Sequence, residues 1–150
     1  MSPLFLCVLK QNLNLLELMY RHSPNEYMDA TNSQGLSALM FAAEQNLKNM
    51  VNYLSLRTKN LNIEDSRGKT IVMHMILQHN YKMVSRLLYR GARIDYVNKF
   101  GKTALHVCVE SKLEEAVKYL LFKGANQHIL DFDELDCCDK AKANGLAKTI

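Results

Sequence analysis

The sequence has few residues that break or stiffen a chain, with two Pro, six Gly and no Trp in 150 residues. This scarcity excludes a collagen-like chain and a proline-rich or glycine-rich disordered chain, and the 48% apolar content indicates a globular protein. Eight Met and no Trp predict a core filled by flexible side chains rather than by large rings. We therefore expect one mainly helical domain over residues 1–150.

Long apolar runs are also missing. The opening run covers only residues 4–9 and has no positive charge ahead of it, so it fails as a signal peptide and as a membrane span. The four cysteines have no metal-ligand spacing, and Cys137 and Cys138 are adjacent, which favours reduced, buried thiols over disulfides. We expect an intracellular, cytoplasmic protein, although the sequence does not exclude the nucleus.

Catalytic and metal-binding motifs are absent from the sequence. It has no phosphate-binding glycine loop, GxSxG or HExxH, and His74 and His79 lie five residues apart, which suits different helix faces. The acidic run at residues 131–136 lacks the central glycine and closing glutamate of a calcium loop, so we interpret it as a solvated hairpin followed by a helix cap. We predict no catalytic residue, no metal site and no cofactor. The possibility of an enzyme whose catalytic part lies outside this segment stays open.

What the sequence does contain is an internal repeat of 33 residues. Three segments align without a gap: GLSALMFAAEQNLKNMVNYL from Gly35, GKTIVMHMILQHNYKMVSRLL from Gly68 and GKTALHVCVESKLEEAVKYLL from Gly101. A repeat at a fixed period predicts stacked units that each contact their neighbours.

Each column of the repeat has a physical role. Ser, Thr or Asp before an apolar run is the preferred helix N-cap, and these residue types recur at Ser37, Thr70, Thr103 and Asp136. Apolar residues at helical spacing then predict a short first helix, and after a polar break a second helix that ends near Gly124. Neither helix could bury its apolar face alone, so the units must stack.

Residues 101–131 resemble an ankyrin repeat. The motif TALH at 103–106 stands where the family has Thr-Pro-Leu-His, and Gly-Ala-Asn at 124–126 stands where it has Gly-Ala-Asp. The resemblance implies an all-α ankyrin-repeat solenoid of stacked helix-turn-helix units with short β-hairpin loops. The implied repeats span about 1–32, 33–65, 66–98 and 99–131, with a partial repeat at 132–150. It also implies a structural hydrogen-bonding role for His106 between neighbouring loops.

The two ends depart from this pattern. The first unit carries two extra residues near 22–27, which we expect to bulge, and the last keeps only the start of a second helix at 146–150. The first helix is apolar nearly all round, which predicts an end-on interface through Leu4, Leu6 and Leu9. Upstream repeats, a partner, a second copy or a fraying terminus remain open as explanations.

The charge of the chain is uneven. Residues 1–66 carry a net charge of −1, residues 67–102 carry +7 and residues 103–150 carry −2. Family members bind partners through hairpin tips and the concave face of the first helices. Carried over by position, the predicted contact residues are Gln34, Leu36, Arg67, Lys69, Leu77, Gln78, Lys99, Phe100, Lys102 and Phe132.

We therefore expect a non-enzymatic interaction module, scaffold or adaptor that binds another protein with an acidic and partly apolar segment. Basic groups around Phe100 suit such a partner. A solvated charged rim, with Phe100 folded back, is the competing explanation. The alternative function is an anion-binding or nucleic-acid-binding module that uses the basic third repeat, although the aromatic interleaving of single-strand binders is missing.

Overall fold

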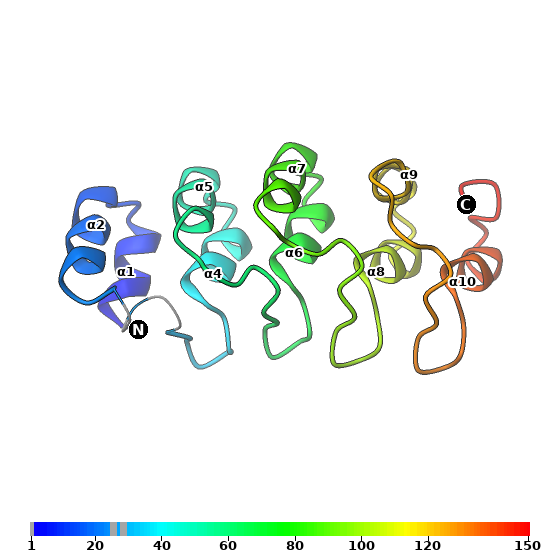
Figure 1. Ribbon diagram of the computed structural model, residues 1–150, viewed down its shortest axis with the longest axis horizontal. Coiled ribbons are helices and arrows are strands. Elements are labelled where there is room, and N and C mark those ends of the chain that lie inside the picture. Colours follow the sequence, from blue (N-terminus) through cyan, green and yellow to red (C-terminus); the bar gives the residue numbers. More distant parts are fainter. Residues whose placement is uncertain (1, 25–26, 28–29) are drawn as a thin grey trace. The chain divides into compact units, whose positions relative to one another are not determined.

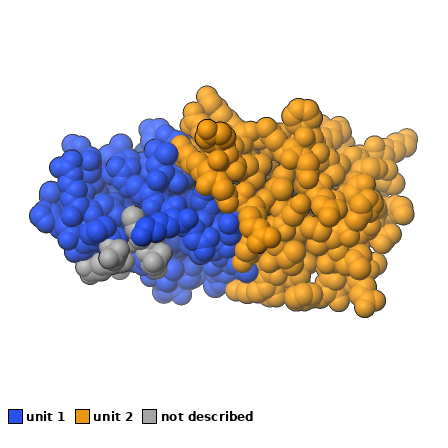
Figure 2. Space-filling model, in the orientation of Figure 1, with its two compact units in different colours: residues 1–74 blue, residues 75–150 orange. Residues whose placement is uncertain are grey.

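A computed structural model describes residues 2–24, 27 and 30–150 of the chain, and in that part it contains nine α-helices. The all-α fold with helices packed in pairs is therefore confirmed. The chain divides into two compact units, residues 1–74 and 75–150 (Figure 2). None of the helices in the described part is long and apolar enough to cross a membrane.

Unit 1, residues 1–74, contains two complete helix pairs (Figure 1). Helix α1 (Pro3–Leu9) packs on α2 (Leu13–His22), and α4 (Ala38–Glu44) packs on α5 (Lys48–Ser55). The first helices of the two pairs, α1 and α4, also contact each other. Their apolar faces meet in a core where the rings of Phe5 and Phe41 pack edge to face, with centroids 5.3 Å apart.

Unit 2, residues 75–150, begins inside helix α6 (Ile71–Leu77). It continues with α7 (Tyr81–Tyr89), α8 (Ala104–Glu110), α9 (Glu114–Phe122) and α10 (Cys137–Ala143). Helix α8 packs against both α9 and α10. On the second helices, the Tyr119 hydroxyl donates a hydrogen bond to the Tyr81 carbonyl at 2.8 Å, and the two rings lie 4.7 Å apart.

The predicted N-caps are confirmed at four first helices. The side-chain oxygens of Ser37, Thr70 and Thr103 accept from backbone amides three residues later at 3.3, 3.3 and 3.4 Å, and Asp136 does so at 2.9 Å. Each bond satisfies an amide that the helix itself leaves unpaired. At these four helices the predicted cap therefore fixes where the helix starts.

The turn between the helices of a pair needs one residue in the left-handed conformation. Four of these turns use a residue with a side chain, namely Gln11, Asn46, His79 and Lys112, with φ between 52° and 56°. Gly145 occupies the same position at the last turn, with φ 78°. Because a Cβ disfavours this conformation, the glycine turn is the less strained one.

Two predictions about the ends of the chain have different outcomes in the structure. Residues 146–149 form a turn, closed by a bond from the Thr149 amide to the Leu146 carbonyl at 2.8 Å, and not the predicted start of a second helix. One turn does not supply the run of successive bonds that propagates a helix. The predicted bulge near residues 22–27 lies partly outside the described residues, which exclude 25, 26, 28 and 29.

Candidate partner-binding surface

Each hairpin tip is held by one Asn or Asp side chain. The Oδ1 atoms of Asn32, Asp65, Asn98 and Asp131 each accept two backbone N–H groups, from the residues two and four positions later, at 2.8–3.1 Å. A backbone bond closes each tip from the amide of the same residue to the carbonyl four positions later. The hairpins are thus tight turns with a side-chain clamp. The sequence analysis missed this column, although it recurs every 33 residues.

In unit 1 the clamp residue Asp65 is buried and paired with a histidine. Its Oδ2 lies 3.0 Å from His74 Nε2 and 3.6 Å from the Arg67 guanidinium. Burial raises the pKa of Asp65, but the Lys69 amide and His74 outweigh it, so the pKa is lowered. Burial lowers the pKa of His74 despite the opposing effect of Asp65. The histidine therefore sits neutral beside an ionised carboxylate at neutral pH.

In unit 2 the clamp residue Asp131 is also buried, and it pairs with Lys140. Lys140 Nζ lies 2.6 Å from Glu110, which in turn lies 2.8 Å from Lys102. Burial lowers the pKa of Lys140, but its bonds to Asp131 and Glu110 outweigh this and raise it. The interpretation of the acidic run as a wholly solvated hairpin is therefore wrong at its first residue. A cation from α10 compensates the buried carboxylate.

His106, in the TALH motif, is fully buried at the start of α8. Its Nδ1 accepts from the Thr103 amide at 3.2 Å while the His106 amide donates to Thr103 Oγ1, which makes a reciprocal capping box. Burial lowers the pKa of His106, whereas the Leu135 backbone acts in the opposite direction. These contacts give the side chain a structural role within the loops of unit 2.

Several predicted contact residues in and after unit 1 are less available than the sequence suggests. Leu36 has an exposed fraction of 0%, because its side chain enters the core instead of the tip surface. Arg67 pairs with Glu44 and Asp65, so much of its charge is compensated within the unit. Gln34 is exposed, Lys69 is half-buried, and Leu77 and Gln78 at the end of α6 are half-buried.

The tips of unit 2 expose two aromatic side chains. Phe100 has an exposed fraction of 50% and Phe132 one of 75%. Lys99 Nζ lies 5.4 Å from the centroid of the Phe100 ring, a cation–π distance. The Phe132 ring lies across Gly101, where an added Cβ would come within 2.5 Å of it. The two adjacent tips thus present apolar rings, while the predicted contact residue Lys102 is bonded to Glu110.

The predicted end-on interface has fewer exposed leucines than the sequence suggests. Leu4 has an exposed fraction of 1%, because α1 turns this side chain toward α2 and α4. Leu6 and Leu9 are exposed, and a shallow apolar depression beside Leu6 also includes Leu15 of α2. An interface at this end would therefore involve Leu6 and Leu9 without Leu4.

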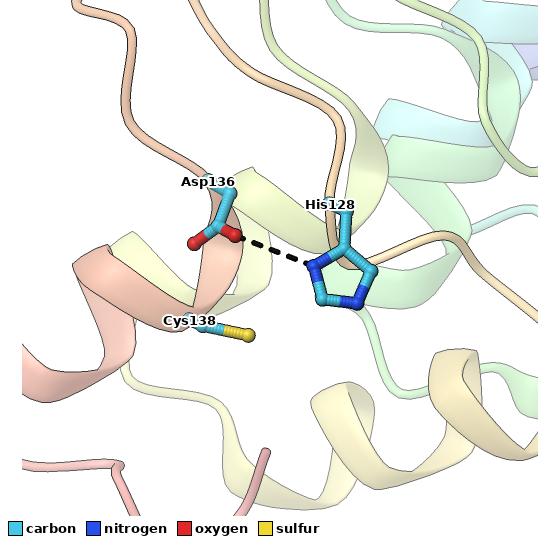
Figure 3. Close-up of side chains that lie close together, drawn as sticks. All are labelled: His128, Asp136 and Cys138. Carbon is cyan, nitrogen blue, oxygen red and sulfur yellow. Dashed lines mark ion pairs between the residues drawn. The ribbon is translucent and has the colours of Figure 1, made fainter.

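One group of potential metal ligands occurs in the described part of unit 2, formed by His128, Asp136 and Cys138 (Figure 3). The sequence analysis did not single it out, because His128 lies in a loop and seven residues separate it from Asp136. The group uses none of the predicted contact residues.

The family model for ankyrin repeats, in three copies, matches residues 55–131, about half of the chain. No curated protein matches the chain. The matched residues include the clamp residues Asp65, Asn98 and Asp131 and the exposed Phe100.

Proposed function

We propose, because this chain belongs to the ankyrin-repeat family, that it is a protein-interaction module that binds an apolar segment of another protein at the hairpin tips of unit 2. Ankyrin repeats in general are protein-binding modules and are typically non-catalytic. The proposed contact surface, called here the aromatic tips, consists of Phe100 and Phe132 with the flanking Lys99.

The observation that carries this proposal is the exposure of two aromatic rings on adjacent, rigid turns. Phe100 and Phe132 are 50% and 75% exposed, and each follows a clamp residue whose Oδ1 holds the turn in place. Large aromatic side chains supply much contact area for little conformational entropy, and they are enriched among the residues that dominate binding energy. Preorganised turns also lower the cost of ordering the surface on binding.

The ion pairs change the chemistry expected of the partner. Arg67 and Lys102, which the sequence analysis assigned to partner contact, are bonded to Glu44 and Glu110. Breaking such pairs to bind an acidic partner would forfeit part of the energy gained. A mainly apolar or aromatic segment therefore suits the aromatic tips better than a strongly acidic one.

A photo-crosslinking experiment tests the proposal. A benzoylphenylalanine placed at position 100 or 132 should trap a specific protein in an extract of the native source. The same probe at position 122 is the matched control, since Phe122 is 83% exposed but lies on the second helix α9. The trapped protein should then bind the Phe100→Ser, Phe132→Ser variant at least tenfold more weakly, because losing two hot-spot aromatics costs about 2 kcal/mol or more.

A crosslinked partner that is the same at all three positions, or one that binds the double variant as tightly as the wild type, contradicts the aromatic tips. In the second case, Leu6→Lys with Leu9→Lys examines the other exposed apolar surface. The Phe122→Ser variant should bind normally and shows that general loss of an exposed ring is not responsible.

No structural observation favours the anion-binding or nucleic-acid-binding alternative. The basic residues Arg67 and Lys102 are engaged in ion pairs within their own units. Binding to phosphate would weaken steeply with salt, because it releases counterions, whereas an aromatic contact would change little. A salt titration of reversible binding between the chain without the probe and the identified partner separates the two functions.

A further inference from the structure

Three side chains with different donor atoms converge beside the last helix of unit 2. His128 comes from the loop after α9, Asp136 is the N-cap of α10, and Cys138 lies in its first turn (Figure 3). Their ligand atoms all lie within 4.8 Å of one another, and His128 Nδ1 lies 3.5 Å from Asp136 Oδ2.

We propose that His128, Asp136 and Cys138 form a binding site for a divalent cation of the zinc class. Two ligands of a tetrahedral zinc ion, each about 2.05 Å from the metal, lie about 3.3 Å apart. The His128–Asp136 separation of 3.5 Å already matches this value. A thiolate and an imidazole around the same ion lie about 3.6 Å apart. The Cys138 sulfur lies within 4.8 Å of the other two ligand atoms, so it would have to approach them by at most about 1.2 Å.

The neighbouring bonds leave the required atoms available. Asp136 uses Oδ1 to accept from the Asp139 amide at 2.9 Å, which fixes the carboxylate and leaves Oδ2 directed toward His128. The Gln127 side-chain nitrogen lies 3.3 Å from His128 Nε2. Metal binding through Nδ1 would leave the proton on Nε2, so the Gln127 amide would have to turn its oxygen toward the ring to accept from it, as the partners of metal-bound histidines do.

The donor set selects the class of ion. A thiolate and an imidazole favour zinc and other late first-row metals, whereas calcium and magnesium prefer sites built from oxygen alone. Three protein ligands leave a fourth position for water or for a group from a partner. His128 is exposed, so this position faces the solvent side of the loop.

Binding would join the loop at His128 to the start of α10. These two points flank the whole terminal hairpin, which includes the clamp residue Asp131 and the exposed Phe132. The bound ion would therefore stabilise the tip that carries one of the two aromatic rings. This site does not depend on the proposed partner binding, because it shares no residue with the aromatic tips.

Cobalt is the probe for the test, because a Co²⁺–thiolate bond gives an ultraviolet absorption band that Zn²⁺ displaces. The full chain, reduced with a phosphine, should bind Co²⁺ with a one-to-one endpoint and a thiolate band. Cys138→Ser should abolish the band, and His128→Ala should weaken Zn²⁺ affinity at least tenfold, by comparison with the effect of disrupting metal-site shells. His22→Ala, which changes another exposed histidine, is the matched control and should bind as the wild type does.

Zinc should also raise the unfolding temperature of the wild type and of His22→Ala, and leave that of Cys138→Ser unchanged. Circular dichroism shows that each variant is folded. The proposal is overturned by a wild-type chain without the thiolate band, by a band that persists in Cys138→Ser, or by unchanged zinc affinity in His128→Ala.

Discussion

Residues 65–79 and residues 131–145, called here the central and terminal segments, lie two repeat periods apart and both start with a buried acidic clamp residue. In the central segment, Asp65 faces His74, and in the terminal segment Asp131 faces Lys140. His74 and Lys140 occupy the same position of the repeat, nine residues after the aspartate. At the other two tips the clamp is Asn32 or Asn98, and the residue nine positions later is Phe41 or Val107.

The comparison shows how a buried charge is handled in a repeated fold. Both Asn and Asp can accept the two backbone amides, so the clamp itself does not require a charge. Where Asp is used, its second oxygen is buried, and the helix supplies a side-chain nitrogen to face it. His74 is neutral at neutral pH, whereas Lys140 remains charged. The two segments should therefore differ in how much stability the loss of this side chain costs and in how stability depends on pH.

The largest expected effect is at the terminal segment. Lys140→Val leaves the buried Asp131 without its cation and should lower the free energy of unfolding by about 3 kcal/mol. Adding Asp131→Asn recreates the Asn98–Val107 combination of the preceding repeat and should recover most of this loss. Urea denaturation of the wild type, both single variants and the double variant measures the coupling. Additive single effects would show that the pair is not coupled.

The corresponding substitution in the central segment should lower the free energy of unfolding by a smaller amount. His74→Val should lower the free energy of unfolding by about 1.5 kcal/mol, because Asp65 keeps the Arg67 and Lys69 amides and the nearby guanidinium. The double variant Asp65→Asn, His74→Val again recreates the Asn98–Val107 combination. A loss as large as that of Lys140→Val would contradict the proposed difference between the neutral histidine and the charged lysine.

The two segments should also respond differently to pH. Burial lowers the pKa of His74 below its ordinary 6.5, so the unfolded chain takes up a proton first and stability falls as pH decreases below that value. Asp65→Asn with His74→Val should flatten this fall between pH 7 and pH 5. Some slope should remain, because burial lowers the pKa of His106 as well.

The contribution of Lys140 to stability depends on pH in the opposite direction. Its pKa is raised above 10.5, so its contribution is complete below that value and is lost as pH rises through the folded-state pKa. Asp131→Asn with Lys140→Val should leave the slope between pH 7 and pH 5 unchanged. Urea titrations at several pH values check both variants, and a flattened acid slope in the terminal variant would refute the assignment.

The smallest effect concerns the turn after the helix, where the terminal segment has Gly145 and the central segment has His79. His79→Gly removes left-handed strain at φ 55° and should raise the free energy of unfolding by about 0.5 kcal/mol, after the entropy cost of glycine. The lost contact between His79 and the Tyr81 hydroxyl is exposed and should matter little. His79→Ala, measured by thermal unfolding, is the control and should give no such gain.

The sequence predicted the features that depend on neighbours within one repeat. The caps at Ser37, Thr70 and Thr103 follow from a hydroxyl three residues before the amide that donates to it, so the pattern is visible in a short stretch. The helix pairs follow from apolar spacing. The Asn and Asp clamps could have been found by the same period, since their bonds reach only four residues along the chain.

The features that depend on distant segments could not be predicted. The pairing of Arg67 with Glu44 joins residues 23 positions apart, and it uses the Arg67 side chain, which the sequence analysis assigned to partner contact. The burial of Leu4 and Leu36 depends on which face each helix or turn directs inward. The convergence of His128 with Asp136 and Cys138 depends on the path of a loop, for which no spacing rule exists.

The pairing of Asp65 with His74 bears on how such repeats can be exchanged between proteins. The predicted repeat boundary falls between residues 65 and 66, so a chimera joined there would take the aspartate from one parent and its histidine from the other. Joined to a parent with valine at the helix position, Asp65 would be buried without its histidine partner. The unit of recombination in this chain therefore begins before the clamp residue, and a library shuffled at residue 62 should yield more folded members than one shuffled at residue 66.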